Sequence, residues 1–288
     1  MNLQAPLAPS APSAPSAATL PVLAFIGGGN MASAILGGLR QQGVAAEQLL
    51  VVEPFAPARD ALAQQLGIQA HAAPGPFLST AALVVWAVKP QNFHEATAAV
   101  KDHTAEALHL SVAAGIRSDS LADWLGTERV VRCMPNTPAL VGRGMTGLFA
   151  RTAVQAADKA LVNQVLQATG QLMWVDQEPL LDAVTALSGS GPAYVYYFIE
   201  AMTAAGVGMG LSADQAKTLA VATFAGAAQL AGSSTESPEV LRQRVTSKGG
   251  TTHAALTSME DSQIKAHFMA ALEKARARAV ELGDEFGA

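Results

Sequence analysis

The sequence predicts an N-terminal α/β domain with a parallel sheet, followed by a smaller all-helical domain. Short apolar runs rich in β-branched residues alternate with alanine-rich stretches in the first part of the chain, which is typical of buried parallel strands joined by helical crossovers. Beyond residue 177 the apolar spacing becomes helical, and no convincing strand follows. A chain of 288 residues, half of them hydrophobic, is long enough for two domains.

The α/β domain is expected over residues 21–177, and the helical domain over residues 178–288. The expected strands, of which the last two are weaker, are 22–26, 49–52, 83–88, 108–113, 130–134, 145–150 and 172–175. The expected helices of the second domain are 180–187, 192–207, 213–230, 238–245 and 252–282. Between them, residues 188–191 and 246–252 are candidate loops of a functional site. The aromatic-rich helix 192–207 is apolar nearly all round, so it is either an ordinary core helix or a helix buried between two subunits.

Composition excludes several classes of protein. Residues 1–20 are almost entirely Ala, Pro and Ser and predict a disordered tail without a secretory signal. A net charge of −5 without basic runs predicts neither a nucleic-acid nor a membrane partner, and no apolar window is long enough for a transmembrane span. The single cysteine, Cys133, is expected to be a buried structural thiol, and the histidine spacing gives no support for a metal site. These features favour a cytoplasmic protein with a small ligand.

A glycine-rich turn follows the first expected strand. Gly27, Gly29 and Ala32 match the pattern G-x-G-x-x-A, with Asn30 and Met31 at the start of the next helix. In this pattern the first glycine permits a tight turn, the second admits a pyrophosphate, and the third small residue lets helix and strand pack closely. The turn therefore predicts a Rossmann-type dinucleotide site, although a purely structural glycine turn is the alternative.

Glu53 ends the second expected strand. An acidic side chain at this position usually accepts hydrogen bonds from the ribose hydroxyls of adenosine, and it would repel a 2′-phosphate. Glu53 therefore favours NADH over NADPH. Two alternatives stay open: Arg59 could pair with a phosphate, and Glu53 could be a solvated residue without a role.

Two further segments close expected strands at the edge where open α/β sheets bind ligands. One is Ala87-Val88-Lys89-Pro90, in which Lys89 is expected beside the nicotinamide half, or else is an ordinary surface lysine. The other is Met134-Pro135-Asn136-Thr137-Pro138, a stiff turn in which Asn136 could face the cofactor. Turn chemistry alone would explain this second segment equally well.

Together these segments resemble one family, the pyrroline-5-carboxylate reductases. The resemblance runs from about Val22 to the C-terminus and excludes only the tail. It is carried, in order, by residues 25–32, 87–90, Ala113-Ala114-Gly115-Ile116, 134–138, Ser188-Gly189-Ser190-Gly191-Pro192-Ala193-Tyr194, and Val245-Thr246-Ser247-Lys248-Gly249-Gly250-Thr251-Thr252. Other reductases of six-phosphogluconate-dehydrogenase-like arrangement share the first segment, whereas the last two segments together are close to diagnostic.

The resemblance implies NADPH or NADH as cofactor and L-1-pyrroline-5-carboxylate as substrate, reduced to L-proline in proline biosynthesis. It implies a C-terminal dimerisation domain that intertwines with a second copy, so the expected assembly is a homodimer, with a ring of dimers left open. It places Ala113, Ala114 and Gly115 at the cofactor.

The resemblance also implies a substrate pocket at the start of the helix 252–282. The expected pocket residues are Val245, Ser247, Gly250, Thr251 and Thr252. A helix N-terminus with free amides and hydroxyls suits a carboxylate. Thr252 is the candidate catalytic residue, because its hydroxyl can hydrogen-bond the ring nitrogen and steer its proton.

Glu178 resembles a family acidic residue near the substrate amine, but a plain capping glutamate is the alternative. Two residues depart from the family pattern: Lys248 stands where proline is usual, and Glu53 stands where many relatives have a small hydroxyl residue. Two competing functions follow. A related imine or β-hydroxyacid reductase is disfavoured because the helix 192–207 has no lysine, and a cofactor-binding relative without turnover is suggested only by Lys248.

Overall fold

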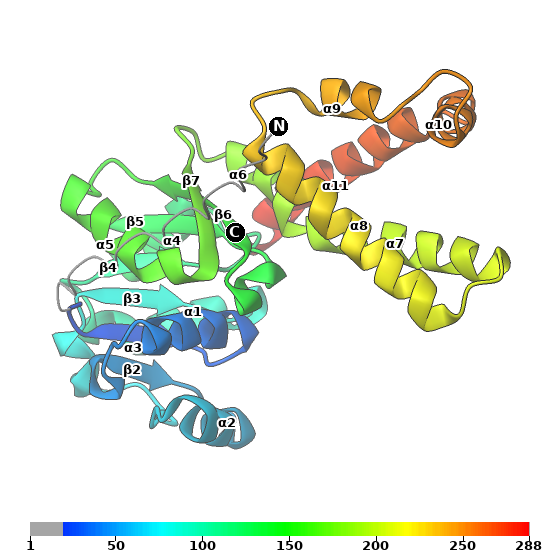
Figure 1. Cartoon of the computed structure of the whole chain (residues 1–288). Coiled ribbons are helices and arrows are strands. Elements are labelled where there is room, and N and C mark those ends of the chain that lie inside the picture. The colour runs from blue at the N-terminus through cyan, green and yellow to red at the C-terminus, as the bar shows by residue number, and fades with distance from the viewer. Residues whose placement is uncertain (1–19, 288) are drawn as a thin grey trace, which may run out of the picture.

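The computed structural model describes residues 20–287 and shows a sheet domain from which a helical domain projects (Figure 1). The expected disordered tail lies outside the described residues except for Leu20. This residue does not belong to a tail, because it is buried in the core and its carbonyl accepts a hydrogen bond from the Gln48 side chain. The ordered chain therefore starts at least one residue earlier than predicted.

The first domain alternates strands and helices as expected. Its strands are β1 Leu23–Ile26, β2 Leu49–Val52, β3 Leu83–Trp86, β4 Leu108–Ser111, β5 Val130–Met134, β6 Gly144–Ala150 and β7 Gly170–Trp174. Its α-helices are α1 Asn30–Gln41, α2 Ala56–Leu66, α3 Phe93–Val100, α4 Ser118–Leu125 and α5 Ala156–Leu166. Short 3-10 helices are η1 Ala46–Gln48, η2 Pro76–Thr80, η3 Pro90–Asn92, η4 Lys101–His103, η5 Thr137–Val141 and η6 Gln167–Thr169.

The sheet has the order β2-β1-β3-β4-β5-β6-β7. Strands β1 to β5 are parallel, with Leu23 of β1 opposite both Leu49 of β2 and Leu83 of β3. Strand β6 runs antiparallel to β5, and β7 pairs parallel to β6. Strand β2 lies on one side of β1, and the chain then crosses to the other side to form β3. The carboxyl ends of β1 to β4 therefore surround the point where such sheets bind ligands.

Both faces of the sheet are covered, which explains the nearly continuous apolar strands. Alternate strand residues such as Phe25 and Val85 pack with Ile35 of α1 and Val162 of α5 on one face. The intervening residues, such as Trp86, pack with α3 and α4 on the other face. The helical periodicity of α1 thus buries one stripe of the helix and leaves its N-terminus at the edge of the sheet.

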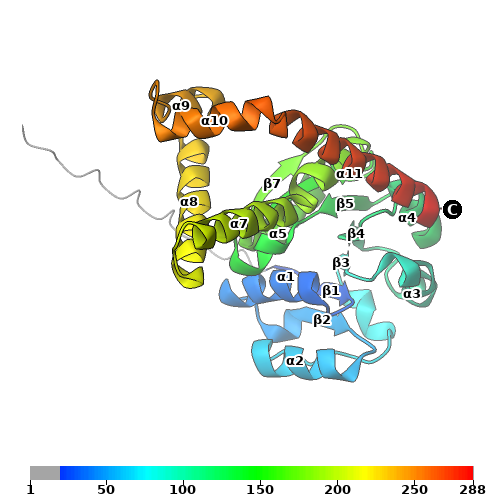
Figure 2. The same cartoon turned by 90° about the vertical axis from the view of Figure 1, so that its right-hand side faces the viewer.

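The second domain is wholly helical. Its helices are α6 Leu180–Val184, the π-helix η7 Thr185–Gly189, α7 Gly191–Gly208, α8 Ala213–Ser233, α9 Pro238–Arg244, α10 Thr251–Asp261 and α11 Ile264–Phe286. Helices α7 and α8 pack as a hairpin that extends away from the sheet, and α11 returns from α10 to the sheet domain (Figure 2).

Two features of this domain differ from the prediction. The expected helix 252–282 is two helices, because Gln263 adopts φ +52 between α10 and α11 and breaks the helical path. The expected loop 188–191 is not a loop, because η7 carries the chain almost directly from α6 into α7. A π-turn accommodates an extra residue within a helix without opening it.

Candidate functional site

The glycine turn joins β1 to α1 in a geometry that only glycine can adopt at its first position. Gly27 has φ +96, and a Cβ built on it would lie 2.5 Å from the Ala87 carbonyl oxygen. The Gly27 amide donates to the Val52 carbonyl at 2.8 Å, which ties the turn to the adjacent strand β2. The backbone of β1, β2 and β3 therefore closes around this turn.

The N-terminus of α1 is open above the turn. Gly29 is the N-cap and provides no side-chain hydrogen bond to the first turn of the helix, and no atom lies within 4 Å of a Cβ built on it. Asn30 is exposed and Met31 half-buried at this end, whereas Ala32 is fully buried and lets helix and sheet approach. Free amides, a positive helix end and empty space fit the pyrophosphate of a dinucleotide.

Glu53 stands beside the turn at the end of β2. Its carboxylate accepts hydrogen bonds from the Gly28 amide and from the Phe55 amide, both at 2.8 Å. Arg59 donates to the backbone carbonyls of Glu53, at 2.9 Å, and Pro54, at 2.7 Å. A fixed carboxylate and an anchored guanidinium thus lie together where the sequence predicts the adenosine ribose.

The segment after β3 passes directly over the glycine turn. The Ala87 amide donates to the Ile26 carbonyl at 2.8 Å, and Val88 is half-buried. Lys89 is exposed and is the N-cap of η3, which Pro90 begins. The strand ends two residues earlier than predicted, so residues 87 and 88 belong to the loop at the ligand edge.

The loop after β4 continues the same edge. Ala113 is buried, Ala114 is half-buried, and Gly115 adopts φ +74. Because β1 to β4 are parallel, their carboxyl ends bring the glycine turn, Glu53, the segment 87–90 and this loop to one edge of the sheet. The structure therefore gathers almost all of the residues predicted to bind the cofactor.

Asn136 lies farther along this edge, after β5, and its side chain has internal partners. Its Oδ1 accepts from the Met145 amide at 2.9 Å, and its Nδ2 donates to the Ser188 carbonyl at 3.0 Å. These bonds connect the turn after β5 to the π-helix η7. Asn136 also borders a groove of about 590 Å³ whose other walls include Pro138, Tyr194 and Phe268.

The predicted substrate residues lie on the connection from α9 to α10. Val245 is 68 % exposed at the end of α9, and Gly250 is the N-cap of α10, where no side chain caps the helix. Thr251 is exposed and Thr252 half-buried in the first turn of α10. A Cβ on Gly250 would lie 2.6 Å from the Ser247 hydroxyl oxygen, so this hydroxyl sits directly against the helix start.

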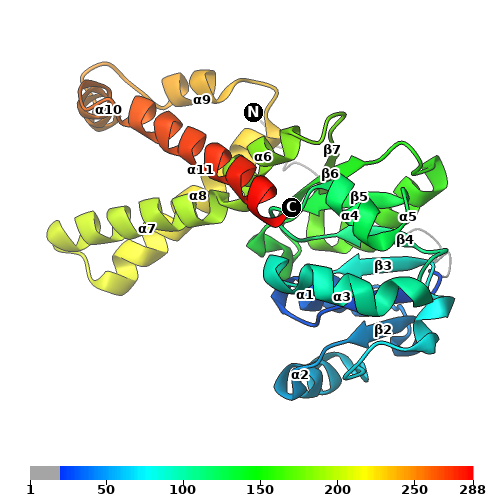
Figure 3. The ribbon, with the colours of Figure 1, turned by 180° about the vertical axis from the view of Figure 1, so that it is seen from behind.

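One chain does not bring this substrate loop to the cofactor edge. Figures 1 and 3 show α9 and α10 at the far end of the helical domain from α1 and the glycine turn. The two halves of the predicted site are therefore separated within a single copy.

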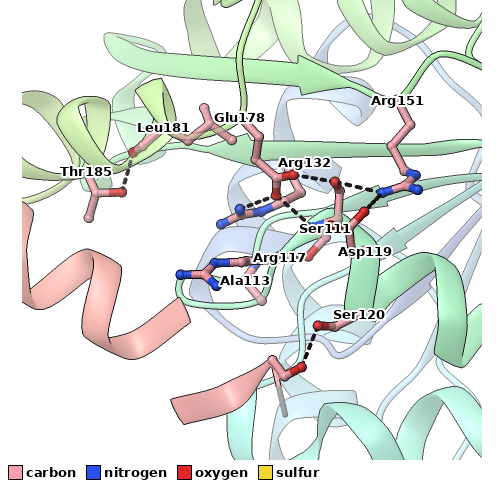
Figure 4. A network of polar contacts seen from close by, with 12 residues as sticks. Ser111, Ala113, Arg117, Asp119, Ser120, Arg132, Arg151, Glu178, Leu181 and Thr185 are labelled. Atoms are coloured by element: carbon pink, nitrogen blue, oxygen red, sulfur yellow. Dashed lines mark hydrogen bonds and ion pairs between the residues drawn. The ribbon is translucent and has the colours of Figure 1, made fainter. Parts of the chain in front are cut away.

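Glu178 lies in a polar network between the domains (Figure 4). Its carboxylate forms an ion pair with Arg132 at 2.5 Å, accepts from the Ser118 amide at 2.7 Å, and also accepts from the Ser118 hydroxyl. It therefore caps α4, rather than the α6 helix that follows it in sequence. These partners occupy both oxygens of the Glu178 carboxylate. Its contact with the substrate stays a prediction.

Arg132 is a partner in this network that is not among the residues predicted from the sequence. A signal was present, because an arginine inside an apolar strand needs a buried carboxylate. Nearby, burial raises the pKa of the Asp182 carboxyl, while the positive charges of Arg132 and Arg117 act to lower it. Arg151 extends the network to Asp119 and Glu128 at the surface.

Cys133 is buried in β5, and burial raises the pKa of its thiol to about 12, as expected for a structural cysteine. Within residues 20–287, no group of three or more His, Cys, Asp or Glu side chains could hold a metal ion. Across the same residues, no helix combines the length and hydropathy needed to cross a bilayer.

The exposed face of the helical hairpin is strongly apolar. On α7, Tyr196 and Tyr197 are 61 % and 69 % exposed, and on α8 Leu219 is 56 % exposed. An apolar surface of this kind is typical of an interface between subunits. This favours the subunit-interface interpretation of the helix 192–207 over that of a core helix.

The parallel sheet and the open glycine turn at its edge define a Rossmann-type dinucleotide-binding domain, to which a separate helical domain is attached. Residues 178–282 match a family model described as pyrroline-5-carboxylate reductase dimerisation, and residues 22–115 match one described as NADP oxidoreductase, coenzyme F420-dependent. The chain belongs to the pyrroline-5-carboxylate reductase family.

Individual relatives agree with this assignment. The chain is 45 % identical over 269 residues to a pyrroline-5-carboxylate reductase of Pseudomonas aeruginosa, covering 93 % of this chain and 98 % of that protein. It is 38 % identical to one of Pisum sativum, with coverage of 90 % and 95 %. Among solved structures, the reductase of Coxiella burnetii has a TM-score of 0.86 at 36 % identity, covering 91 % of this chain and 98 % of that one. The Plasmodium falciparum enzyme, solved with NADP bound, has a TM-score of 0.82 at 30 % identity, with the same coverage.

Proposed function

We propose that this chain reduces L-1-pyrroline-5-carboxylate to L-proline. The observation that carries the proposal is the uncapped, open N-terminus of α1 beside a glycine turn, together with a hydroxyl-lined helix start at α10. The first suits a dinucleotide and the second suits a small carboxylate. A nicotinamide cofactor, when bound, supplies the hydride for the C5 carbon of the ring imine.

The residues of the chain have three tasks in this reaction. The free amides at the start of α10 and the hydroxyls of Ser247 and Thr251 hold the substrate carboxylate. The hydroxyl of Thr252 hydrogen-bonds the ring nitrogen and steers the proton that this atom gains. The loops after β3 and β4 hold the ring of the cofactor against the substrate, so that most of the rate acceleration comes from orientation.

The active unit is a homodimer, in which the α10 loop of one copy faces the cofactor edge of the other. The separation of these two halves in a single chain and the exposed apolar face of α7 support this arrangement. Measuring the mass of the assembly in solution would distinguish a single dimer from a larger ring of dimers. The cytoplasmic location also stays a prediction.

Glu53 makes NADH the preferred cofactor. Its carboxylate is fixed by two backbone amides, so it cannot easily turn away from an incoming 2′-phosphate. Arg59 is close enough to moderate this repulsion, because it is anchored on the neighbouring carbonyls. Replacing Glu53 by serine should move the preference toward NADPH.

The test follows NADH and NADPH absorbance with and without L-1-pyrroline-5-carboxylate. Thr252→Ala should lower turnover by roughly tenfold to a hundredfold, as expected for a lost proton-steering group, and Thr252→Ser should restore most of it. Thr257→Ala is the matched control, because Thr257 is exposed on the same helix and donates only to the His253 carbonyl. Cofactor binding without any substrate-dependent oxidation would contradict the proposed reaction.

A mixing experiment tests the shared site. Gly29→Asp should fold normally, since aspartate is a good N-cap residue and the position is open, yet its charge should block the pyrophosphate. Gly29→Asp should be nearly inactive alone, and Thr252→Ala alone should keep about a tenth of the wild-type activity or less. Co-expressed, half of the dimers are mixed and have one intact site, so about a quarter of wild-type activity should return. A mixture no more active than Thr252→Ala alone would show that each site lies within one chain.

A further inference from the structure

The end of α11 packs directly against the loop that joins β4 to α4, residues 112–117. Figure 2 shows α11 running from α10 back to α4. A Cβ built on Gly115 would lie 3.0 Å from the Leu282 Cβ and 3.2 Å from the Phe286 ring. Gly115 adopts φ +74, a backbone conformation that favours glycine, so the loop has no side chain of its own at this position. The helix end therefore closes the back of this loop.

Several contacts fasten the two segments. Phe286 packs on the buried cluster that contains Ala113 and Ile116. Asp284 forms an ion pair with Arg117 at 2.6 Å, and the Ser120 hydroxyl donates to the Gly287 carbonyl at 2.8 Å. The ion pair is about half exposed and contributes little to stability, so Phe286 is the main anchor.

The position of this loop follows from the strand order. Glu53 ends β2 on one side of the glycine turn, whereas residues 112–117 follow β4 on the other side. A dinucleotide whose pyrophosphate lies at α1 and whose adenosine lies at Glu53 extends its nicotinamide toward the loop after β4. A displacement of this loop would therefore affect the nicotinamide half and leave the adenosine half in place.

We propose that the final turn of α11 positions the 112–117 loop for the nicotinamide half of the cofactor, with Phe286 as the positioning residue. The inference rests on the proposed function for the placement of the cofactor. Asp284, Phe286 and Gly287 lie beyond residues 178–282, which match the dimerisation family. The anchor is thus a separate use of α11, the helix that follows α10.

The test compares the binding of NADH with the binding of ADP, which corresponds to the adenosine half of the cofactor. Phe286→Ala should raise the Kd for NADH, measured by fluorescence titration, by roughly tenfold, whereas the Kd for ADP, which has no nicotinamide, should stay within about twofold. Phe286→Leu should restore most of the NADH affinity because it refills the contact. Glu285→Ala, an exposed change in the same turn, should alter neither Kd.

Three outcomes are distinguishable. Wild-type protein that binds neither NADH nor NADPH would sink the proposed function itself. Wild-type protein that binds NADH while Phe286→Ala weakens NADH and ADP equally, or weakens neither, would overturn the inference alone. If Phe286→Ala does not fold, Phe286→Val, which keeps part of the apolar contact, takes its place, and the same ratio of the two Kd values decides.

Discussion

His109 is a buried base that the fold keeps neutral. It lies on β4 and is 1 % exposed. Its Nδ1 accepts a hydrogen bond from the Trp86 indole at 3.0 Å, and its Nε2 lies 3.2 Å from the Thr104 carbonyl oxygen, so Nε2 carries the proton. Burial lowers the pKa of His109 from 6.5 to about 4; the hydrogen bond to Thr104 raises it, and the charge of Arg129 lowers it further.

This shift makes stability depend on pH in a definite direction. The folded state binds the proton more weakly than the unfolded state, so the contribution of His109 is complete above pH 6.5 and is lost as the pH falls toward 4. With these two pKa values, linkage gives a loss of about 2 kcal/mol in the free energy of unfolding at pH 5. The loss approaches about 3 kcal/mol at lower pH.

The assay is urea unfolding followed by tryptophan fluorescence near pH 7.5 and near pH 5, at one chain concentration. His109→Asn removes the titration and keeps an acceptor for Trp86, so the variant should be less stable near pH 7.5 but lose about 2 kcal/mol less on acidification than the wild type. His94→Asn, at an exposed histidine, should match the wild-type pH dependence. An identical pH dependence of wild type and His109→Asn would refute the reasoning.

Three other changes have definite expected results. Gly27→Ala should abolish cofactor binding in a fluorescence titration, because its Cβ would lie 2.5 Å from the Ala87 carbonyl oxygen. Arg132→Met should lower the free energy of unfolding by about 3 kcal/mol in urea, because it leaves the Glu178 carboxylate half-buried without its partner. Tyr197→Glu should shift the protein from dimer to monomer in light scattering and remove activity, because it places a charge on the apolar face of α7.

The sheet could be predicted because buried parallel strands leave nearly continuous apolar runs. Residues 130–134 show such a run, and the structure has a strand over the same residues. The direction of β6 could not be predicted in this way, since an apolar pattern does not record which way a strand runs. Its antiparallel pairing with β5 depends on the short connection through η5, which is part of the tertiary structure and not of the local sequence pattern.

The helical domain shows where local patterns are insufficient. Nothing in the composition around Gln263 marks a positive φ, so α10 and α11 were predicted as one helix. Gly189 and Gly191 suggested a loop, yet they lie where η7 meets α7, because small residues also permit close packing, as where Gly189 approaches Met134. In both places the surroundings of the helix, and not its own residues, decide the path.

The site divides in the same way. The glycine turn and Glu53 could be placed from the sequence, because each follows directly from the strand before it. The partner of Glu178 could not, because Arg132 is 46 residues away and no local spacing joins the two. The distance between the α10 loop and the cofactor edge was equally hidden, since it depends on the path of α7 to α11 through space.

The apolar face of α7 has a consequence for how this chain can change. If two identical copies meet through this face about a two-fold axis, the face is self-complementary. Each contact between different residues then occurs twice, and any substitution enters the interface twice. The effect of a substitution on the stability of the dimer is therefore doubled, whether the substitution improves the packing or harms it. Tyr196 and Tyr197 would therefore tolerate fewer replacements than equally exposed residues that lie outside the interface.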